Sequence, residues 1–315
     1  AYNRNHSTPM KNKTLALQRS ATKSALPARL NDSVSGSLIA LCLLSSSAAH
    51  SAEQNTEELP DTTIIANRIA TPLSQVGSSV SVLDVSELED QGILQLDEAL
   101  KFVPGVVSES LGGQRGFSST FFLRGTKTNH AHLVVDGMRI SDANMTSGGF
   151  LGSSNLNGLS RIEVLRGPQG ALYGGDSIGG VIGIYSSKGK GDSSGKLCVE
   201  GGSHNTWNTL LAIQGESGDF AYSLNLGHEH TDNDLPHNAF EMFSYALRLD
   251  YAVNPCLNVG LTLRGADTTF QAPAYGGPYS SPLDDELRYT MATIFAEYEV
   301  NPFWINKLTL GLYDQ

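Results

Sequence analysis

Strict alternation of apolar and polar side chains in the last third of the chain constrains the fold more than any other feature of the sequence. Over residues 220–227, Phe, Tyr and Leu alternate with Ala, Ser, Asn and Gly, and the same period of two recurs over 245–252 and 257–264. This period is that of a β-strand with one apolar and one polar face. The pattern predicts about seven strands, near residues 196–203, 206–215, 219–229, 242–253, 256–266, 289–300 and 306–315.

The links between these strands alternate between short and long. Residues 216–219, 254–255 and 301–306 form short links, whereas residues 231–241 and 267–288 form long ones. A β-sandwich or jelly roll, the soluble alternative, has no reason to place long loops on every second connection. A membrane barrel has short turns at one rim and long loops at the other, and strands of about ten residues can cross the hydrocarbon layer at a tilt. The pattern therefore favours a transmembrane barrel wall.

Several polar side chains fall on the other face of these predicted strands. Arg248, Asp250 and Arg264 alternate with apolar residues and are expected to point into the lumen. His228 and His230 are two apart and therefore share one strand face. We interpret the histidine pair as lumen-facing, with metal binding as the alternative.

The middle of the chain has mixed helical and strand character. A strand at 80–84 is followed by a helix from Ser86, and helical spacing over 94–102 ends at the pair Pro104-Gly105. Further strands are predicted at 120–124, 131–136 and 162–166. The segment is therefore expected to form a small α+β domain.

Glycine is dense over residues 170–180, after the last of these strands. Glycine permits positive φ angles and close backbone approach, which suit either a phosphate cradle or a tightly packed body. Because the sequence contains no GxxxxGK[ST] pattern, we favour the structural role.

The beginning of the chain has the pattern of an exported protein. A basic stretch precedes the apolar residues 38–44, and small residues follow at 45–49. This order is typical of a secretory signal cleaved after Ala49 or Ala52, with a short buried helix as the alternative. Residues 53–60 are acidic and polar, as in a flexible tether.

Charge and motif content argue against several classes of function. The formal net charge is −11, and acidic residues dominate after residue 52, where they would repel nucleic-acid phosphates. The three cysteines have no CxxC or Cys/His spacing that would indicate a metal cluster or a disulfide framework. Ser177 lies in the sequence GDSIG at 175–179, but no helix-forming run follows it as a GxSxG elbow requires, and no HExxH pattern occurs, so the sequence does not predict an enzyme.

A series of short motifs resembles those of TonB-dependent outer-membrane receptors, from Asp61 to the end of the chain. Residues 61–66 look like a TonB box, and the other carriers are PGV at 104–106, FLRG at 122–125, VVDGMR at 134–139, RIEVLRGP at 161–168, LYGG at 172–175 and IGGVIGI at 178–184. Within the family, the likeness is to cobalamin receptors. It is carried by ANR at 66–68, STFFLRGT at 119–126 and TDND at 231–234.

The resemblance implies roles for three sets of residues. The TonB-binding segment would be Asp61, Thr62, Thr63, Ile64, Ile65 and Ala66. Charge pairs between plug and barrel would involve Arg124, Glu163 and Arg166, with surface ion pairs on the plug as the alternative. Ligands for Ca²⁺ in the extracellular loops would be Asp232, Asp234 and Asp267, with a solvated acidic loop as the alternative. No other cofactor is expected.

The function that the resemblance implies is TonB-dependent active transport of a scarce ligand across the outer membrane of a Gram-negative bacterium. Cobalamin or a related corrinoid is the first expectation. The implied partners are TonB with its inner-membrane energy-transducing complex, a small ligand such as a corrinoid or metal chelate, and outer-membrane lipid. A ferric siderophore or haem receptor is the alternative within the family, and a passive porin or adhesin barrel is the alternative of another class.

The resemblance also implies how the chain is organised: an α+β plug domain followed by an incomplete antiparallel transmembrane β-barrel. We expect an N-terminal extension with a signal peptide at 1–52 and a periplasmic tether with the TonB box at 53–78. The plug, facing the periplasm, is expected at 79–192, and the first barrel strands at 193–315. Because family barrels have about 22 strands, the chain is expected to be truncated, and its unpaired edges predict that this piece alone is not a stable transporter.

Overall fold

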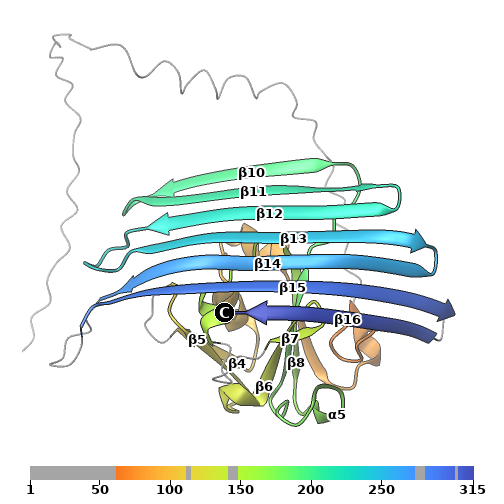
Figure 1. The fold of residues 1–315 in the computed structure, drawn as a ribbon. Coiled ribbons are helices and arrows are strands. Elements are labelled where there is room, and N and C mark those ends of the chain that lie inside the picture. Colours follow the sequence, from red (N-terminus) through yellow and green to blue (C-terminus); the bar gives the residue numbers. More distant parts are fainter. Residues whose placement is uncertain (1–61, 111–114, 141–147, 274–280, 302–303) are drawn as a thin grey trace, which may run out of the picture. The chain divides into compact units, whose positions relative to one another are not determined.

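The structure is a computed structural model that describes residues 62–110, 115–140, 148–273, 281–301 and 304–315 (Figure 1). The expected signal peptide, the acidic tether and Asp61 lie outside the described residues. Within the described ranges, no helix has the length and apolar content needed to cross a membrane.

The largest element is a seven-stranded antiparallel sheet, hereafter the wall, whose strands neighbour one another in chain order. Its members are β10 (Ser194–Gly202), β11 (Thr206–Ser217), β12 (Phe220–Thr231), β13 (Phe240–Asn254), β14 (Leu257–Ala272), β15 (Leu283–Asn301) and β16 (Trp304–Asp314). Figure 1 shows them as a series of long, adjacent strands, with β10 and β16 at the two edges. The seven strands predicted from the alternating pattern are therefore confirmed.

The wall strands are longer than predicted at the end that carries the long connections. The two long links shrink to 232–239 and 273–282. The first shrinks because β12 and β13 pair as far as Thr231↔Phe240, and the second because β14 and β15 pair as far as Ala272↔Leu283. Over this extension the outward face of β14 is polar, with Asp267 and Gln271, whereas Phe270 and Ala272 are buried on the inward face. The apolar and polar residues therefore exchange faces there, although the backbone pairing continues.

The two faces of the wall differ sharply in chemistry. Large apolar side chains are exposed on the outward face, where Ile294, Leu310 and Leu312 have exposed fractions of 60%, 62% and 78%. The opposite, inward face is covered over the central strands, where Ser223 and Thr262 are 4% and 5% exposed. An extensive apolar surface in contact with water is unfavourable, so the outward face is suited to lipid.

Aromatic side chains border this apolar face at both ends. Phe220, Tyr251, Tyr298 and Trp304 lie near the short turns, and Trp207 lies at the opposite end, beside His230 in the strand register. Aromatic rings are enriched where a membrane barrel meets the two interfaces. The surface between these two aromatic borders is therefore an apolar band of the kind that faces hydrocarbon.

Strand parity corrects the orientation predicted for the histidine pair. Glu229 lies between His228 and His230 in β12 and is 6% exposed on the inward face. Because neighbouring strand residues point to opposite faces, both histidines point outward. His228 Nε2 lies 3.0 Å from Glu241 Oε1, near the end of the apolar band that Trp207 borders. Arg248, Asp250 and Arg264 have the predicted inward orientation.

The second part of the molecule, hereafter the plug, contains a five-stranded sheet with the strand order β3-β8-β9-β6-β7. These strands are β3 (Ser79–Asp84), β6 (Ala131–Val135), β7 (Met138–Ile140), β8 (Leu159–Arg166) and β9 (Gly180–Ser186). A hairpin of β4 (Val106–Ser110) and β5 (Ser119–Leu123) stands apart from this sheet. The helices and turns are α2 (Val85–Asp90), α3 (Leu96–Ala99), η2 (Leu100–Phe102), η3 (Thr128–His130), α4 (Gly148–Gly152) and α5 (Gly170–Tyr173).

The plug begins its first helix one residue earlier than the sequence predicted. Asp84, not Ser86, is the N-cap of α2, because its carboxylate accepts a hydrogen bond from the Ser86 backbone N–H at 2.7 Å. An aspartate at this position satisfies an amide that has no partner within the helix.

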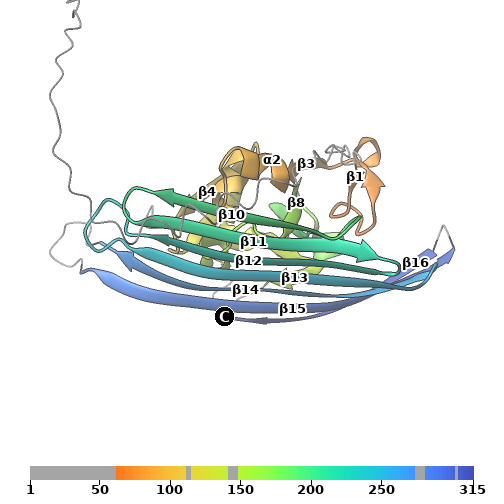
Figure 2. The same ribbon diagram turned by 90° about the horizontal axis from the view of Figure 1, so that it is seen from above.

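One apolar core joins the plug to the inward face of the wall. Leu100, Phe121, Phe150 and Ile162 of the plug are in the same cluster of buried side chains as wall residues, and Phe150 packs edge-on against Tyr289 at 5.0 Å between ring centroids. Figure 2, seen from above, shows the plug elements together on one side of the wall. The fold is thus an α+β plug packed against an incomplete antiparallel barrel wall.

Candidate functional site

Residues 62–66, the described part of the TonB-binding segment predicted at 61–66, are docked on the plug. Thr62 and Thr63 form β1 (Thr62–Thr63), which pairs with β2 (Thr71–Pro72), just before the turn η1 (Leu73–Gln75). One oxygen of Glu163, Oε2, accepts hydrogen bonds from Thr63 Oγ1 at 2.6 Å and from the backbone N–H groups of Ile64 and Ile65, each at 2.9 Å. The Glu163 side chain is fully buried, and its other oxygen, Oε1, faces Arg161 Nε at 3.0 Å.

Apolar packing adds to these hydrogen bonds. Ile65 is 1% exposed and belongs to a small cluster with Ala66, Val134, Leu165 and Val181. Tyr173 donates its hydroxyl to the Ile65 carbonyl at 2.7 Å. Burial raises the pKa of Tyr173, against the opposing charge of Arg68, so the donating form of the hydroxyl is the one present at neutral pH.

Glu163 was predicted to form a charge pair between plug and barrel. In the structure its ion pair is with Arg161 of the same strand, and its hydrogen bonds are with the docked segment. The reason is geometric: Glu163 lies in the second strand of the five-stranded sheet, between Val82 of β3 and Gly183 of β9, and it points away from the core that the plug shares with the wall. Its contacts in the described part of the chain therefore lie within the plug.

Arg124 and Arg166, the other two residues of that prediction, lie next to each other near Pro104 and Gly105. Arg166 Nη1 donates to the Pro104 carbonyl at 2.6 Å, and the Arg124 backbone N–H donates to the Gly105 carbonyl at 2.8 Å. Burial, and then the charge of Arg124, lower the pKa of Arg166. Among the described residues neither guanidinium has an ion-pair partner, so a pairing with barrel carboxylates remains a prediction for both.

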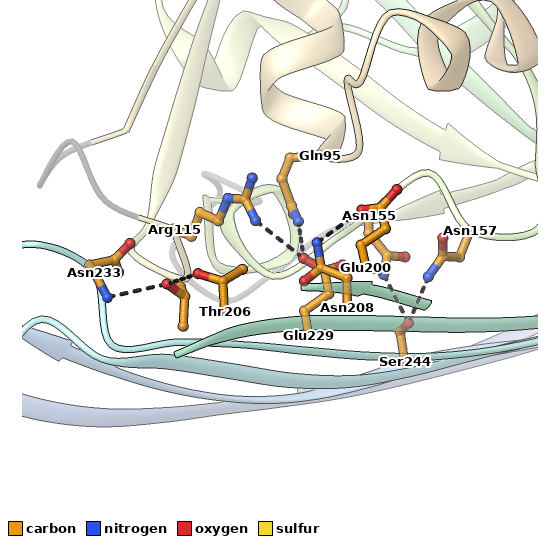
Figure 3. A network of polar contacts seen from close by, with 11 residues as sticks. Gln95, Arg115, Asn155, Asn157, Glu200, Thr206, Asn208, Glu229, Asn233 and Ser244 are labelled. Carbon is orange, nitrogen blue, oxygen red and sulfur yellow. Dashed lines mark hydrogen bonds and ion pairs between the residues drawn. The ribbon is translucent and has the colours of Figure 1, made fainter. Parts of the chain in front are cut away.

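A network of polar side chains connects the plug to the wall (Figure 3). Glu229 of β12 accepts a hydrogen bond from Gln95 Nε2 at 2.9 Å and another from Asn155 Nδ2 at 3.2 Å, and it lies 3.5 Å from Arg115 Nη1. Asn155 also donates to Ser244 Oγ of β13 at 2.8 Å. Gln95 and Asn155 form an isolated β-bridge, so both amides project from one edge of the plug.

Two arginines of the wall extend this connection. Arg264 donates to the backbone carbonyls of Asn155 and Asn157. Arg248 donates to the Ser186 carbonyl at 2.9 Å while pairing with Asp250 at 2.8 Å. Guanidinium groups on the inward face of the wall thus donate charge-assisted hydrogen bonds to backbone carbonyls of the plug.

The predicted calcium ligands are not gathered at one point. Asp232 lies 3.4 Å from His230, Asp234 is exposed in the connection 232–239, and Asp267 is in β14, where it pairs with Arg288. In the described part of the chain, no group of three or more acidic, histidine or cysteine side chains is placed to hold a metal ion. Calcium binding therefore stays a prediction, and no step of the proposed mechanism depends on it.

Sequence reasoning missed Glu229, Gln95 and Asn155. Strand parity places Glu229 on the inward face, and this was the signal available in the sequence. Its partners are separated from it by 134 and 74 residues, so no local pattern connects them.

Fold and site together show a plug domain that packs against part of an antiparallel barrel wall. Residues 72–181 match the family described as TonB-dependent Receptor Plug Domain, and the chain has the sequence motifs and fold of TonB-dependent receptors, which are proteins of the Gram-negative outer membrane. The resemblance inferred from the motifs is confirmed.

Curated relatives with similar sequence include vitamin B12 transporters. The chain is 37% identical over 145 residues to the Vitamin B12 transporter BtuB of Vibrio vulnificus, a match that covers 45% of this chain and 23% of that protein. It is 31% identical over 156 residues to the Vitamin B12 transporter BtuB of Photobacterium profundum, covering 50% and 25%. The matched region is thus about a quarter of the length of these relatives.

Solved structures with a similar fold are receptors for other ligands. The ferripyoverdine receptor of the outer membrane of Pseudomonas aeruginosa aligns with a TM-score of 0.66 at 18% identity, over 79% of this chain and 36% of that one. The ferric yersiniabactin uptake receptor FyuA from Yersinia pestis aligns with a TM-score of 0.61 at 22% identity, over 74% and 40%. At these identities the likeness establishes the fold alone.

Proposed function

We propose that the receptor formed with this chain carries a corrinoid, such as cobalamin, across the outer membrane in a TonB-dependent step. The observation that carries the proposal is the sequence identity of 31–43% to vitamin B12 transporters over stretches of 126–156 residues. The plug would block free diffusion through the barrel. Ligand bound at the extracellular side would lead to release of residues 62–66 to TonB in the periplasm.

The docked segment supports the TonB-dependent part of this proposal. Its two threonines already adopt a strand, and an extended segment that leaves its docking site can add to the edge of a partner sheet through backbone hydrogen bonds. Force applied to the segment would act directly on β8, because Glu163 connects the two.

An uptake experiment tests both parts of the proposal. Cells that depend on this receptor should accumulate labelled cyanocobalamin, and they should not accumulate ferric siderophores. Deletion of residues 62–66 should abolish accumulation while cobalamin binding to the cell surface stays within about twofold, since the ligand site lies on the other side of the plug.

The rivals give different results in the same experiment. A siderophore receptor would accumulate the iron chelate and leave cobalamin outside. A passive porin would take up ligand after the deletion of residues 62–66, or after collapse of the proton gradient, and this outcome would contradict the proposal.

A further inference from the structure

The backbone groups that strand addition would need are occupied in the docked segment. The N–H groups of Ile64 and Ile65 donate to Glu163, the Ile65 carbonyl accepts from Tyr173, and the Thr62–Thr63 strand is paired with β2. A partner strand bonds through the same N–H and C=O groups. Docking on the plug and pairing with a partner are therefore mutually exclusive.

Glu163 is well suited to hold this segment. Its carboxylate is fully buried, so its charge requires compensation, and the compensation comes from Arg161 on one oxygen and three donors of the segment on the other. Hydrogen bonds to an ionised acceptor are stronger than neutral ones. The carboxylate is therefore better compensated when the segment is docked than when the segment has left and Arg161 is its only partner among the described residues.

Gly183 provides the space that Ile65 occupies. A Cβ atom at Gly183 would lie 2.8 Å from Ile65 Cδ1 and 3.0 Å from the Tyr185 hydroxyl, which is closer than side-chain contacts allow. The docking site therefore has space for the Ile65 side chain. It also forms hydrogen bonds with the backbone of the segment.

We propose that Glu163 and Tyr173 form a latch that sets how often the segment 62–66 is available to TonB in the ligand-free protein. Glu163 is a positioning residue in this role, because it acts through the segment and does not touch the transported ligand. The proposal rests on the proposed function, in which that segment is the TonB-binding site. Weakening the latch should raise the affinity for TonB in the absence of transported ligand. The reason is that the apparent affinity is proportional to the fraction of molecules in which the segment is free to bind.

The test combines two measurements on the intact protein in detergent. Hydrogen exchange reports the protection of the Ile64 and Ile65 amides, and titration with the periplasmic domain of TonB reports the affinity. Tyr173→Phe removes one hydrogen bond and should raise both the exchange rate and the TonB affinity by about 2- to 12-fold. Glu163→Ala should raise both by about tenfold or more, and Glu163→Gln, which retains one acceptor oxygen, should fall between Glu163→Ala and the wild type.

Tyr222→Phe is the matched control. It removes the contact of the Tyr222 hydroxyl with Ser193 at 2.7 Å, which is remote from residues 62–66, and should change neither measurement. Tyr173→Phe keeps the proposal testable if Glu163→Ala does not fold.

Each outcome has a defined meaning. Unchanged amide protection in both Tyr173→Phe and Glu163→Ala would overturn the latch. If deletion of residues 62–66 abolishes TonB binding but the latch variants leave the affinity unchanged, the latch does not control availability. If that deletion leaves TonB binding intact, the proposed function itself fails, independently of the exchange result.

Discussion

Replacing Gly180 with alanine is expected to destabilise the plug by about 3–5 kcal/mol. Gly180 begins β9 with φ of +145°, and a Cβ atom at this position would lie 2.1 Å from the Leu165 carbonyl oxygen and 2.8 Å from Leu123 Cδ2. The carbonyl belongs to the adjacent strand, so relief requires the β8-β9 ladder to separate at Arg166↔Gly180. Pulse proteolysis in a urea series, applied to the membrane-embedded protein, measures the loss.

Gly175→Ala is the matched control within the same glycine-dense segment. Its Cβ would meet nothing within 4 Å. The change is expected to alter the plug's free energy of unfolding by less than about 0.5 kcal/mol. Equal effects of the two substitutions would contradict a structural role that depends on position within this segment.

The second large effect is expected from Glu229→Leu, which removes the acceptor at the centre of the polar network between plug and wall. Gln95 and Asn155 are 5% and 2% exposed, and the substitution leaves amide donors of both without the Glu229 acceptor. The unpaired buried amide donors should weaken seating of the plug by about 3 kcal/mol. Arg115 adds little, because its side chain is 41% exposed and can be solvated. Protease digestion of the plug at increasing urea concentration, with the wall as internal reference, measures the change.

Glu241→Leu is the control for this substitution. Glu241 is in the neighbouring strand, on the outward face, with a side-chain exposure of 55% and a surface pairing to His228. An exposed ion pair of this kind contributes little, so the change should stay within about 0.5 kcal/mol. A Glu229 variant that digests like the Glu241 variant would show that the network does not hold the plug.

The wall could be predicted from the sequence because its signal is local. In β12 each residue lies on the face opposite its neighbour, so the alternation of apolar Leu224 with polar Ser223 predicts which face each side chain occupies. The prediction was wrong for His228 and His230 because it followed their polarity, although their positions continue the outward series of Leu224 and Leu226. The burial of Glu229 between them confirms the orientation that parity gives.

The docking of residues 62–66 could not be predicted in the same way. Glu163 and Thr63 are 100 residues apart, and their contact arises only when β8 is placed between β3 and β9 in the plug sheet. The motif around Glu163 indicated a buried charge, and the structure gives that charge a partner other than the one expected. A buried carboxylate requires compensation, but sequence alone does not specify which donors provide it.

The assignment of the wall to lipid is tested most directly by the accessibility of paired neighbouring positions. Spin labels would be attached to single cysteines in a variant whose three natural cysteines are replaced by serine. Leu224, Leu247 and Leu261 face outward, and their neighbours Ser223, Ala246 and Thr262 are 4%, 5% and 5% exposed beneath the plug. In membranes, relaxation by dissolved oxygen should be high at the three leucine positions and low at their neighbours. Equal accessibility to oxygen within each pair, or high accessibility of the leucine positions to a water-soluble nickel chelate, would contradict the account.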